Sequence, residues 1–165
     1  MKLTGEEGVA FELTVESYEF PEIEDEPWDS NWLLVRGRIK HPRGSWSFFE
    51  PCLTTWEIEL IARWLERLVT GEVSRSALDF NEPNLRFLFA VQPVFAVEVR
   101  FAYECAPPWI DPEIPTMEGV GVLFPLSFND LKEAARNLRQ NLLRFPPRDA
   151  PIDLDKVDLP TRPSH

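Results

Sequence analysis

Three glutamates at the ends of predicted strands are the residues best placed to do chemistry: Glu50, Glu82 and Glu104. Two carboxyl groups held in one cleft, one protonated and one ionised, are the machinery of many hydrolases. The chain has 28 acidic residues, so an apparent pair can arise by chance, and nothing in the spacing shows that these three converge. Because an active site is recognised from its geometry, a carboxylate-based hydrolase is the less favoured alternative.

Residues for other kinds of catalysis are scarce. The two histidines are His41, in a predicted turn, and His165, so the sequence offers no histidine pair for a metal. Cys52 and Cys105 show no CxxC spacing and no neighbouring histidine, which argues against thiolate metal binding. The segment 118–121 has GxG spacing but lacks the third glycine and the helix start of a dinucleotide site. We expect no catalytic residue, no metal and no cofactor.

The negative charge is concentrated in the first 30 residues. The formal net charge of the chain is −11, and this segment has ten acidic residues against the single base Lys2, which amounts to −9. Such a chain cannot release counterions from a phosphate backbone, so direct binding of nucleic acid is not expected. A charge run is often only a solvated face, and that alternative stays open.

Membrane insertion and export are not expected either. The apolar runs are far shorter than the roughly 20 residues that cross a bilayer. The opening residues, MKLTGEEGVAFEL, lack the basic and then apolar pattern of a signal peptide. We therefore predict a cytoplasmic protein without membrane contact.

Two tryptophans in irregular, proline-flanked segments are candidates for binding a partner. Trp28 follows the acidic run 24–26, and Trp109 lies between prolines in the segment 107–112. Tryptophan often anchors an interface, and surrounding charge raises the rate of association. The predicted partner-binding residues are Glu22, Glu24, Asp25, Glu26, Trp28, Asp29 and Trp109. Two alternatives stay open: a loop tryptophan folded back over a sheet edge, and binding through the loop 104–117, whose four prolines pre-organise it.

Other aromatic and cysteine side chains are expected to build the core. Trp46 and Trp64 lie on the apolar faces of periodic segments, which predicts burial, whereas the pattern leaves Trp56 open. Cys52 and Cys105 are expected to be buried and reduced, because cysteine is among the residues most often buried. Whether they ever pair is left open.

Alternation of apolar and polar residues is the main structural pattern, and it predicts strands joined by short connections. The turn at 41–44, with proline second and glycine fourth, predicts a hairpin. The expected strands lie near residues 9–15, 33–39, 45–48, 78–80, 85–91, 95–103 and 120–124.

Helical spacing appears twice, near residues 54–70 and 127–145. Each helix begins with a capping box, formed by Thr54 with Glu57 and by Ser127 with Asp130. The predicted class is α+β, an antiparallel β-sheet of about six to seven strands with two α-helices packed against it. Residues 1–146 form the single domain, and residues 147–165 form a proline-rich, extended or mobile tail.

Several short segments share a pattern with a known family. They are Trp28-Asp29-Ser30-Asn31-Trp32-Leu33, Gly44-Ser45-Trp46, Leu53 with the helix start after it, Phe80-Asn81-Glu82-Pro83-Asn84-Leu85, and the stretch from Leu142 to Pro146. The pattern covers roughly residues 18–148 and resembles the WapI-type immunity proteins.

That resemblance implies a small bacterial protein that accompanies a polymorphic, contact-dependent toxin and binds the toxin's C-terminal domain. In the namesake system the toxin is a nuclease acting on tRNA, but toxin identity does not transfer within such a family. The implied function is a non-enzymatic immunity protein that neutralises a cognate toxin domain, with a basic nuclease as one candidate, since an acidic inhibitor can occupy a phosphate-binding cleft. A structural or adaptor role is the alternative.

Overall fold

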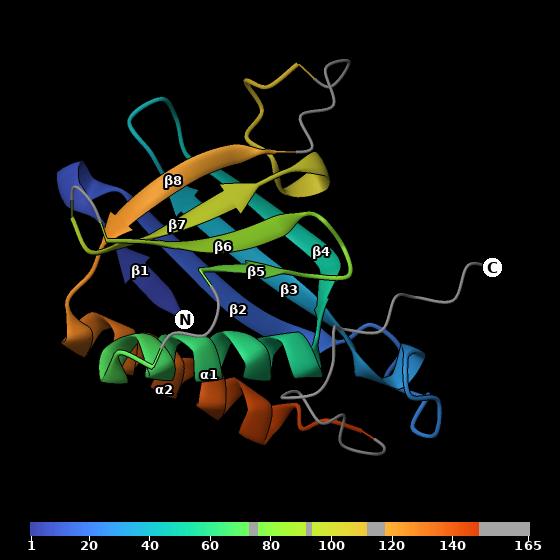
Figure 1. Ribbon diagram of the computed structural model, residues 1–165. Coiled ribbons are helices and arrows are strands. Elements are labelled where there is room, and N and C mark those ends of the chain that lie inside the picture. The colour runs from blue at the N-terminus through green and yellow to red at the C-terminus, as the bar shows by residue number, and fades with distance from the viewer. Residues whose placement is uncertain (73–75, 92–93, 112–117, 149–165) are drawn as a thin grey trace.

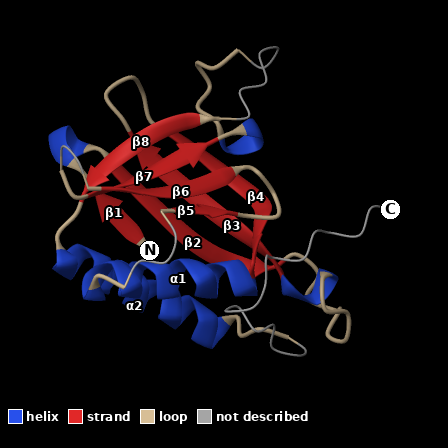
Figure 2. Ribbon diagram, in the orientation of Figure 1, coloured by secondary structure: helices blue, strands red, loops and turns tan. Residues whose placement is uncertain are grey.

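The alternating residues build antiparallel strands that divide between two four-stranded sheets (Figures 1 and 2). The computed structural model describes residues 1–72, 76–91, 94–111 and 118–148. Sheet A has the order β1 (Lys2–Thr4), β2 (Ala10–Tyr18), β3 (Trp32–Lys40) and β4 (Trp46–Thr54). Sheet B has the order β5 (Ala77–Asp79), β6 (Leu85–Ala90), β7 (Ala96–Phe101) and β8 (Val120–Pro125). The helices are α1 (Thr55–Thr70) and α2 (Phe128–Arg144).

The predicted α+β class, with two helices and antiparallel strands, is confirmed. The described strands number eight, close to the predicted six to seven; the additional one is β1, whose 3 residues are too few for alternation to show. The predicted hairpin joins β3 to β4, with the Gly44 amide donating to the His41 carbonyl over 3.0 Å. Alternation shows which residues share a face but not which strands pair, so the division into two sheets could not be predicted.

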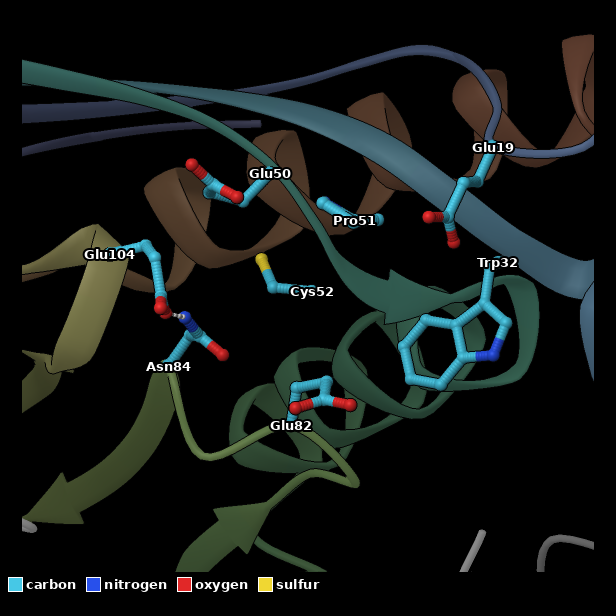
Figure 3. Close-up of a pocket in the computed structure, with 8 residues that line it drawn as sticks. All are labelled: Glu19, Trp32, Glu50, Pro51, Cys52, Glu82, Asn84 and Glu104. Carbon is cyan, nitrogen blue, oxygen red and sulfur yellow. Dashed lines mark hydrogen bonds between the residues drawn. The ribbon is translucent and has the colours of Figure 1, made fainter. Parts of the chain in front are cut away.

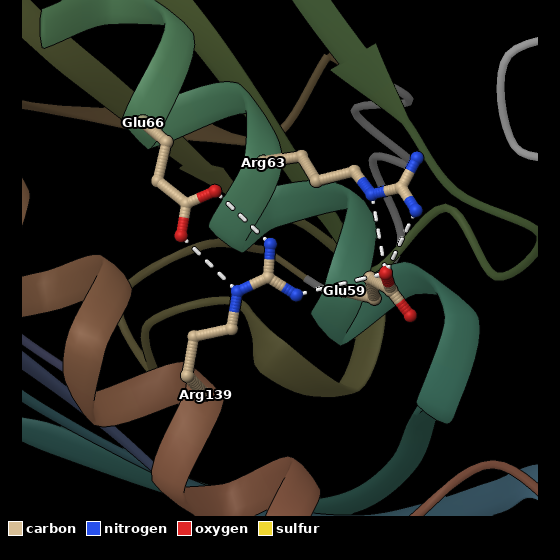
Figure 4. Close-up of polar contacts among 4 residues, drawn as sticks. All are labelled: Glu59, Arg63, Glu66 and Arg139. Atoms are coloured by element: carbon tan, nitrogen blue, oxygen red, sulfur yellow. Dashed lines mark hydrogen bonds and ion pairs between the residues drawn. The ribbon is translucent and has the colours of Figure 1, made fainter.

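The two sheets pack face to face around one core. Phe11 on β2 meets Phe101 on β7 edge to face, with ring centroids 5.0 Å apart. Sheet B lies in front of sheet A in Figure 1, and the two helices lie against each other along the lower end of both sheets. Trp64 on α1 contacts Phe87 on β6, so α1 packs against sheet B. Figure 4 shows the polar contact between the helices, where Arg139 on α2 donates two hydrogen bonds to Glu66 on α1.

The same capping motif begins both helices in different surroundings. At α1 the Glu57 carboxylate accepts hydrogen bonds from the Thr54 amide and hydroxyl, and burial raises its pKa. At α2 the Asp130 carboxylate is exposed, and hydrogen bonds from Ser127 lower its pKa. Asp130 therefore contributes stability above its unfolded pKa, and this contribution is lost as the pH falls through the lower, folded value.

The predicted core side chains are confirmed. Trp46 and Trp64 are buried, and Trp56, which the pattern left open, is 2 % exposed. Cys52 and Cys105 are buried free thiols. Neither described helix has a stretch long and apolar enough to cross a membrane. The tail predicted for residues 147–165 lies outside the described residues from residue 149 onward.

Replacing the buried cap carboxylate tests its contribution to stability. In Glu57→Gln an amide nitrogen replaces one of two oxygens that each accept hydrogen bonds, so two donors face each other in a buried site. We expect the free energy of unfolding in urea to fall by about 2 kcal/mol. The matched control is Asp130→Asn in the exposed capping box of α2, where the free energy of unfolding should fall by less. Equal losses in the two variants would show that burial of Glu57 adds nothing.

Candidate functional site

The charged segment before β3 forms a surface loop, residues 19–31, which we call the acidic loop. Glu22, Glu24, Asp25 and Glu26 are exposed, and Asp29 is partly exposed in the short 3-10 helix Asp29–Asn31. The five acidic residues predicted to bind a partner therefore lie together on one loop, with their side chains directed away from the core.

The side chain of Arg148 fixes the backbone of the acidic loop through hydrogen bonds to its carbonyls. One guanidinium nitrogen, Nη1, donates to the carbonyls of Phe20, Pro21 and Ile23 over 3.4, 3.1 and 2.8 Å. The guanidinium carbon lies 3.6 Å from the centroid of the Tyr18 ring. The loop therefore has a set backbone conformation although its carboxylates repel one another.

The fully buried Asn31 closes the other end of the acidic loop. Its amide nitrogen donates to the carbonyls of Pro27 and Arg148 over 2.8 and 2.6 Å. Its oxygen accepts from the Thr55 hydroxyl and the Arg148 amide over 2.7 and 2.8 Å. One side chain thus joins the loop, the start of α1 and the chain that follows α2. Sequence analysis missed this role, because nothing in a sequence distinguishes a buried asparagine from a loop asparagine.

The two candidate anchor tryptophans each lie edge to face on a buried tryptophan. The Trp28 ring stands at 88° to the Trp56 ring with centroids 5.6 Å apart, and the Trp109 ring stands at 82° to the Trp46 ring with centroids 5.2 Å apart. Trp109 also contacts His41 and lies beneath the Arg43 guanidinium, so it rests on the β3–β4 turn. Both rings are partly exposed and backed by core aromatics.

The structure does not bring the two anchors together. Trp109 lies at the beginning of β4, against Trp46, and Trp28 lies beyond its end, against Trp56. A strand rises about 3.3 Å per residue, so these positions are separated by about 25 Å. The predicted residues therefore mark the two ends of the outer edge of sheet A, where β4 pairs only with β3 among the described strands.

Between the anchors, an acidic cavity of about 250 Å³ opens beside β4 (Figure 3). The sequence named Glu50, Glu82 and Glu104 as possible chemical groups without evidence that they converge, and all three line this cavity together with Glu19 from the acidic loop. The remaining lining residues are Trp32, Pro51, Cys52 and Asn84. Glu19 belongs to both the cavity and the acidic loop, and we call these two features together the acidic edge.

Two β-bulges shape sheet A beside the cavity. Leu34 on β3 lies opposite the Pro51–Cys52 pair, because Leu33 pairs with Leu53 and Val35 pairs with Glu50. The register between β2 and β3 shifts at the same level, past Glu16. Bulges re-aim side chains and are common beside functional sites, and proline is tolerated there because it has no amide to donate.

Hydrogen bonds hold the opposite wall of the cavity. Glu57 accepts from the Asn81 amide over 2.7 Å, which fixes the β5–β6 loop that carries Glu82 and Asn84. The Asn84 side chain, 6 % exposed, donates to a Glu104 carboxylate oxygen over 2.7 Å. The walls of the cavity are thus linked to both sheets before any partner binds.

The lining of the cavity is acidic, with four carboxylates among its eight residues. Among the described residues, no group of three or more His, Cys, Asp or Glu side chains is arranged to hold a metal ion. Hydrogen bonding with Cys52 and burial raise the pKa of Cys105, which keeps the thiol protonated and a poor nucleophile. The buried Glu57, whose pKa burial raises, does not line the cavity, so it cannot serve there as the acid of a hydrolase pair.

The fold and the site define a small α+β protein with a concave, anionic edge. The family model of the immunity protein WapI-like family matches residues 2–146, and the chain belongs to that family. No curated protein and no solved structure matches the chain. Family membership confirms the resemblance found in the sequence and indicates a toxin-neutralising role with a toxin as the binding partner. Members of the family are generally non-enzymatic.

The support of the acidic loop can be tested without a partner. Arg148→Ala removes a charged donor from three carbonyls, so we expect the Ile23 and Ser30 amides to exchange hydrogen about ten-fold faster. Amide exchange followed by NMR or mass spectrometry measures this change. The control is Arg144→Ala, whose guanidinium lies over Phe145 and not on the loop. Unchanged exchange in Arg148→Ala would mean that the loop holds its conformation without this cation.

Proposed function

We propose that this protein binds and neutralises a cognate bacterial toxin domain with a basic surface, and that it does so through the acidic edge beside β4. The predicted partner residues Glu22, Glu24, Asp25, Glu26 and Asp29 steer the encounter, while Trp28 and Trp109 anchor the complex. The observation that carries the proposal is that exposed carboxylates, a cavity lined by carboxylates and two partly exposed tryptophans lie along one edge of a protein of an immunity family.

Steering fits the charge distribution. A cluster of like charges on one face creates a potential that attracts an oppositely charged partner and raises the association rate 10- to 1,000-fold. The acidic loop holds its carboxylates in place through Arg148, so little conformational entropy is lost when the partner binds. A nuclease is the candidate toxin that this surface suits best, because a cleft that grips phosphates is basic.

Anchoring fits the tryptophan geometry. Each anchor ring is already held by a buried ring, so it offers a rigid apolar surface at small entropic cost. Their separation along β4 is comparable to the breadth of a standard protein interface of about 800 Å² per partner. The protein acts in the cytoplasm of the producing cell, where its free thiols would remain reduced.

A rescue experiment tests the function as a whole. The toxin to use is the C-terminal domain of a large secreted protein encoded beside this gene. Cells that express this domain should survive when the immunity protein is co-expressed and die when it is not. Purified proteins should form a stable complex without any modification of the toxin. Rescue without a complex would support an enzymatic mechanism, and failure of both would refute the proposal.

Reversing the charge of the acidic loop should slow association. In the variant with Glu22, Glu24, Asp25 and Glu26 all changed to Lys, we expect the association rate at low salt to fall about 10-fold or more, with a weaker dependence on salt. Stopped-flow mixing over a range of ionic strength measures both quantities. The matched control reverses four exposed acids elsewhere, Glu6, Glu7, Glu72 and Glu118. Equal effects of the two variants would show that only net charge matters.

Truncating an anchor should act on dissociation instead. Trp28→Ala and Trp109→Ala each remove a rigid aromatic contact, so we expect each dissociation rate to rise about 30-fold, equivalent to about 2 kcal/mol. Surface plasmon resonance measures the rates, and urea unfolding of each free variant shows whether the fold survives. If the folded Trp28→Ala protein dissociated from the toxin at the wild-type rate, Trp28 would not be part of the interface.

A further inference from the structure

The two cysteines of the chain come from different sheets and are buried against each other. The buried side of β4 packs on the end of β7, where the Trp46 ring contacts Phe101 edge to face. Cys52 lies further along β4, and Cys105 follows β7 in the 3-10 helix Tyr103–Cys105. The Trp46 indole donates to the Cys105 carbonyl over 3.0 Å, which holds that helix against β4. The two thiols are in hydrogen-bonding contact, and neither takes part in a disulfide.

A strained turn directs Cys105 toward the core. Tyr103 has a φ of 49°, a left-handed backbone conformation that aromatic residues rarely adopt. The turn leaves the Tyr103 ring 44 % exposed, whereas Cys105, two residues later, is fully buried. Strain of this kind persists only where the surrounding structure enforces it. Here the Cys105 amide donates to the Ala102 carbonyl, and its carbonyl accepts from Trp46, so the fold sets the position of Cys105 beside Cys52.

The two sulfur atoms differ in their access to small molecules. Cys52 lines the cavity beside β4, and Figure 3 shows its sulfur directed into the space between Glu50 and Glu104. Cys105 does not line the cavity. Its hydrogen bond with Cys52 and its burial raise the pKa of the Cys105 thiol, so this thiol stays protonated. An oxidant that enters the cavity therefore meets Cys52 first.

The size and charge of the cavity select the kind of oxidant. The cavity of about 250 Å³ has room for hydrogen peroxide, which is little larger than a water molecule. Its eight lining residues include four carboxylates and, within the described part of the chain, no basic side chain. These carboxylates repel anionic oxidants such as glutathione disulfide, and they do not repel a neutral peroxide.

We propose that Cys52 and Cys105 form a reversible disulfide bond when the protein meets hydrogen peroxide, and that this bond joins sheet A to sheet B at the cavity. Glu50 lies two residues before Cys52, and Glu104 is the neighbour of Cys105. The bond therefore fixes the backbone on two walls of the cavity. The proposal concerns the free protein and does not depend on the proposed function.

The reaction has two steps. Cys52 Sγ attacks one oxygen of the peroxide, so an S–O bond forms, the O–O bond breaks, and the thiol proton leaves with the departing oxygen as water. Cys105 Sγ then attacks the sulfur of the Cys52 sulfenic acid, so the S–S bond forms, the S–O bond breaks, and a second water leaves. The two thiols together supply the two electrons that reduce one peroxide to two waters. Direct contact of the sulfurs offsets the weak nucleophilicity of the protonated Cys105, because the second step is intramolecular.

Mass spectrometry of the full chain tests whether the bond forms. The reduced protein, freed of reductant, is treated with hydrogen peroxide, then unfolded in N-ethylmaleimide and digested without reductant. We expect a linked pair of peptides that contains Cys52 and Cys105, no alkylation of either cysteine, and reversal of both results by dithiothreitol. Cysteines that remain unlinked, or a bond between two copies of the chain, would overturn the proposal.

Two matched single variants test the order of attack. In Cys105→Ser the sulfenic acid of Cys52 has no thiol to meet, so we expect Cys52 to go on to sulfinic acid. In Cys52→Ser the remaining thiol does not line the cavity, so it should react with peroxide at least about ten-fold more slowly. Urea unfolding verifies the fold of each variant, and equal rates in two folded variants would overturn the assigned order. If either variant fails to fold, the linked peptides of the wild-type protein still decide whether the bond exists.

Thermal unfolding and ionic strength test the fit of the bond and the choice of oxidant. The bond closes a long loop between the two sheets, so we expect the oxidised protein to melt about 5 °C or more above the reduced protein. A lower melting temperature after oxidation would show that the thiols are not positioned for a disulfide. Added salt should accelerate oxidation by glutathione disulfide, because it screens the carboxylates, and should leave the rate with peroxide unchanged. Faster reaction of glutathione disulfide at low salt would contradict the role given to the carboxylates.

Discussion

One buried carboxylate, Glu57, holds together the parts of the chain on which the acidic edge depends. Its two oxygens accept four hydrogen bonds, from the amide and hydroxyl of Thr54 at the end of β4 and from the amide and side chain of Asn81 before β6. A buried charge is costly unless its acceptor capacity is used, which is why burial raises its pKa while these bonds oppose the rise. The end of β4 in sheet A and the β5–β6 loop of sheet B both donate hydrogen bonds to this one carboxylate. The positions of Glu82 and Asn84 relative to Glu50 follow from it.

The acidic loop solves a related electrostatic problem in a different way. Its carboxylates repel one another, and this repulsion favours extended conformations of the loop unless the backbone is fixed. Arg148 binds three backbone carbonyls, and Asn31 joins the loop to the start of α1. The Arg148 guanidinium thus binds main-chain oxygens. Among the described contacts, none pairs it with an exposed carboxylate of the loop. The charge of the loop remains available to a partner while its shape is set by the fold.

How much of this could be read from the sequence differs between local and long-range features. The capping boxes of Thr54 and Ser127, the turn at 41–44 and the main strands followed from residue types a few positions apart, and the structure confirms them. The family pattern was also readable, although it named no binding residue. The cavity was not readable, because Glu19, Glu50, Glu82 and Glu104 come from four separate segments and converge only through the pairing of strands and the bulge at Pro51–Cys52. The roles of Asn31 and Arg148 were hidden for the same reason, since their contacts span more than 110 residues.

The same convergence gives the acidic edge two parts that differ in electrostatic character, the exposed acidic loop and the cavity beside β4. Exposed charges act over roughly a Debye length, about 10 Å at an ionic strength of about 0.1 M, so they attract most basic partners and distinguish poorly between them. A cavity discriminates differently: a group that fits satisfies acceptors already desolvated by the fold, whereas a group that does not fit leaves them without donors at a cost. The Asn84 side chain belongs to such a fixed wall, because it is buried and donates a hydrogen bond to Glu104. The shape of the cavity therefore depends on the buried hydrogen bonds of Glu57 and Asn84 and not on the number of acidic residues at the surface.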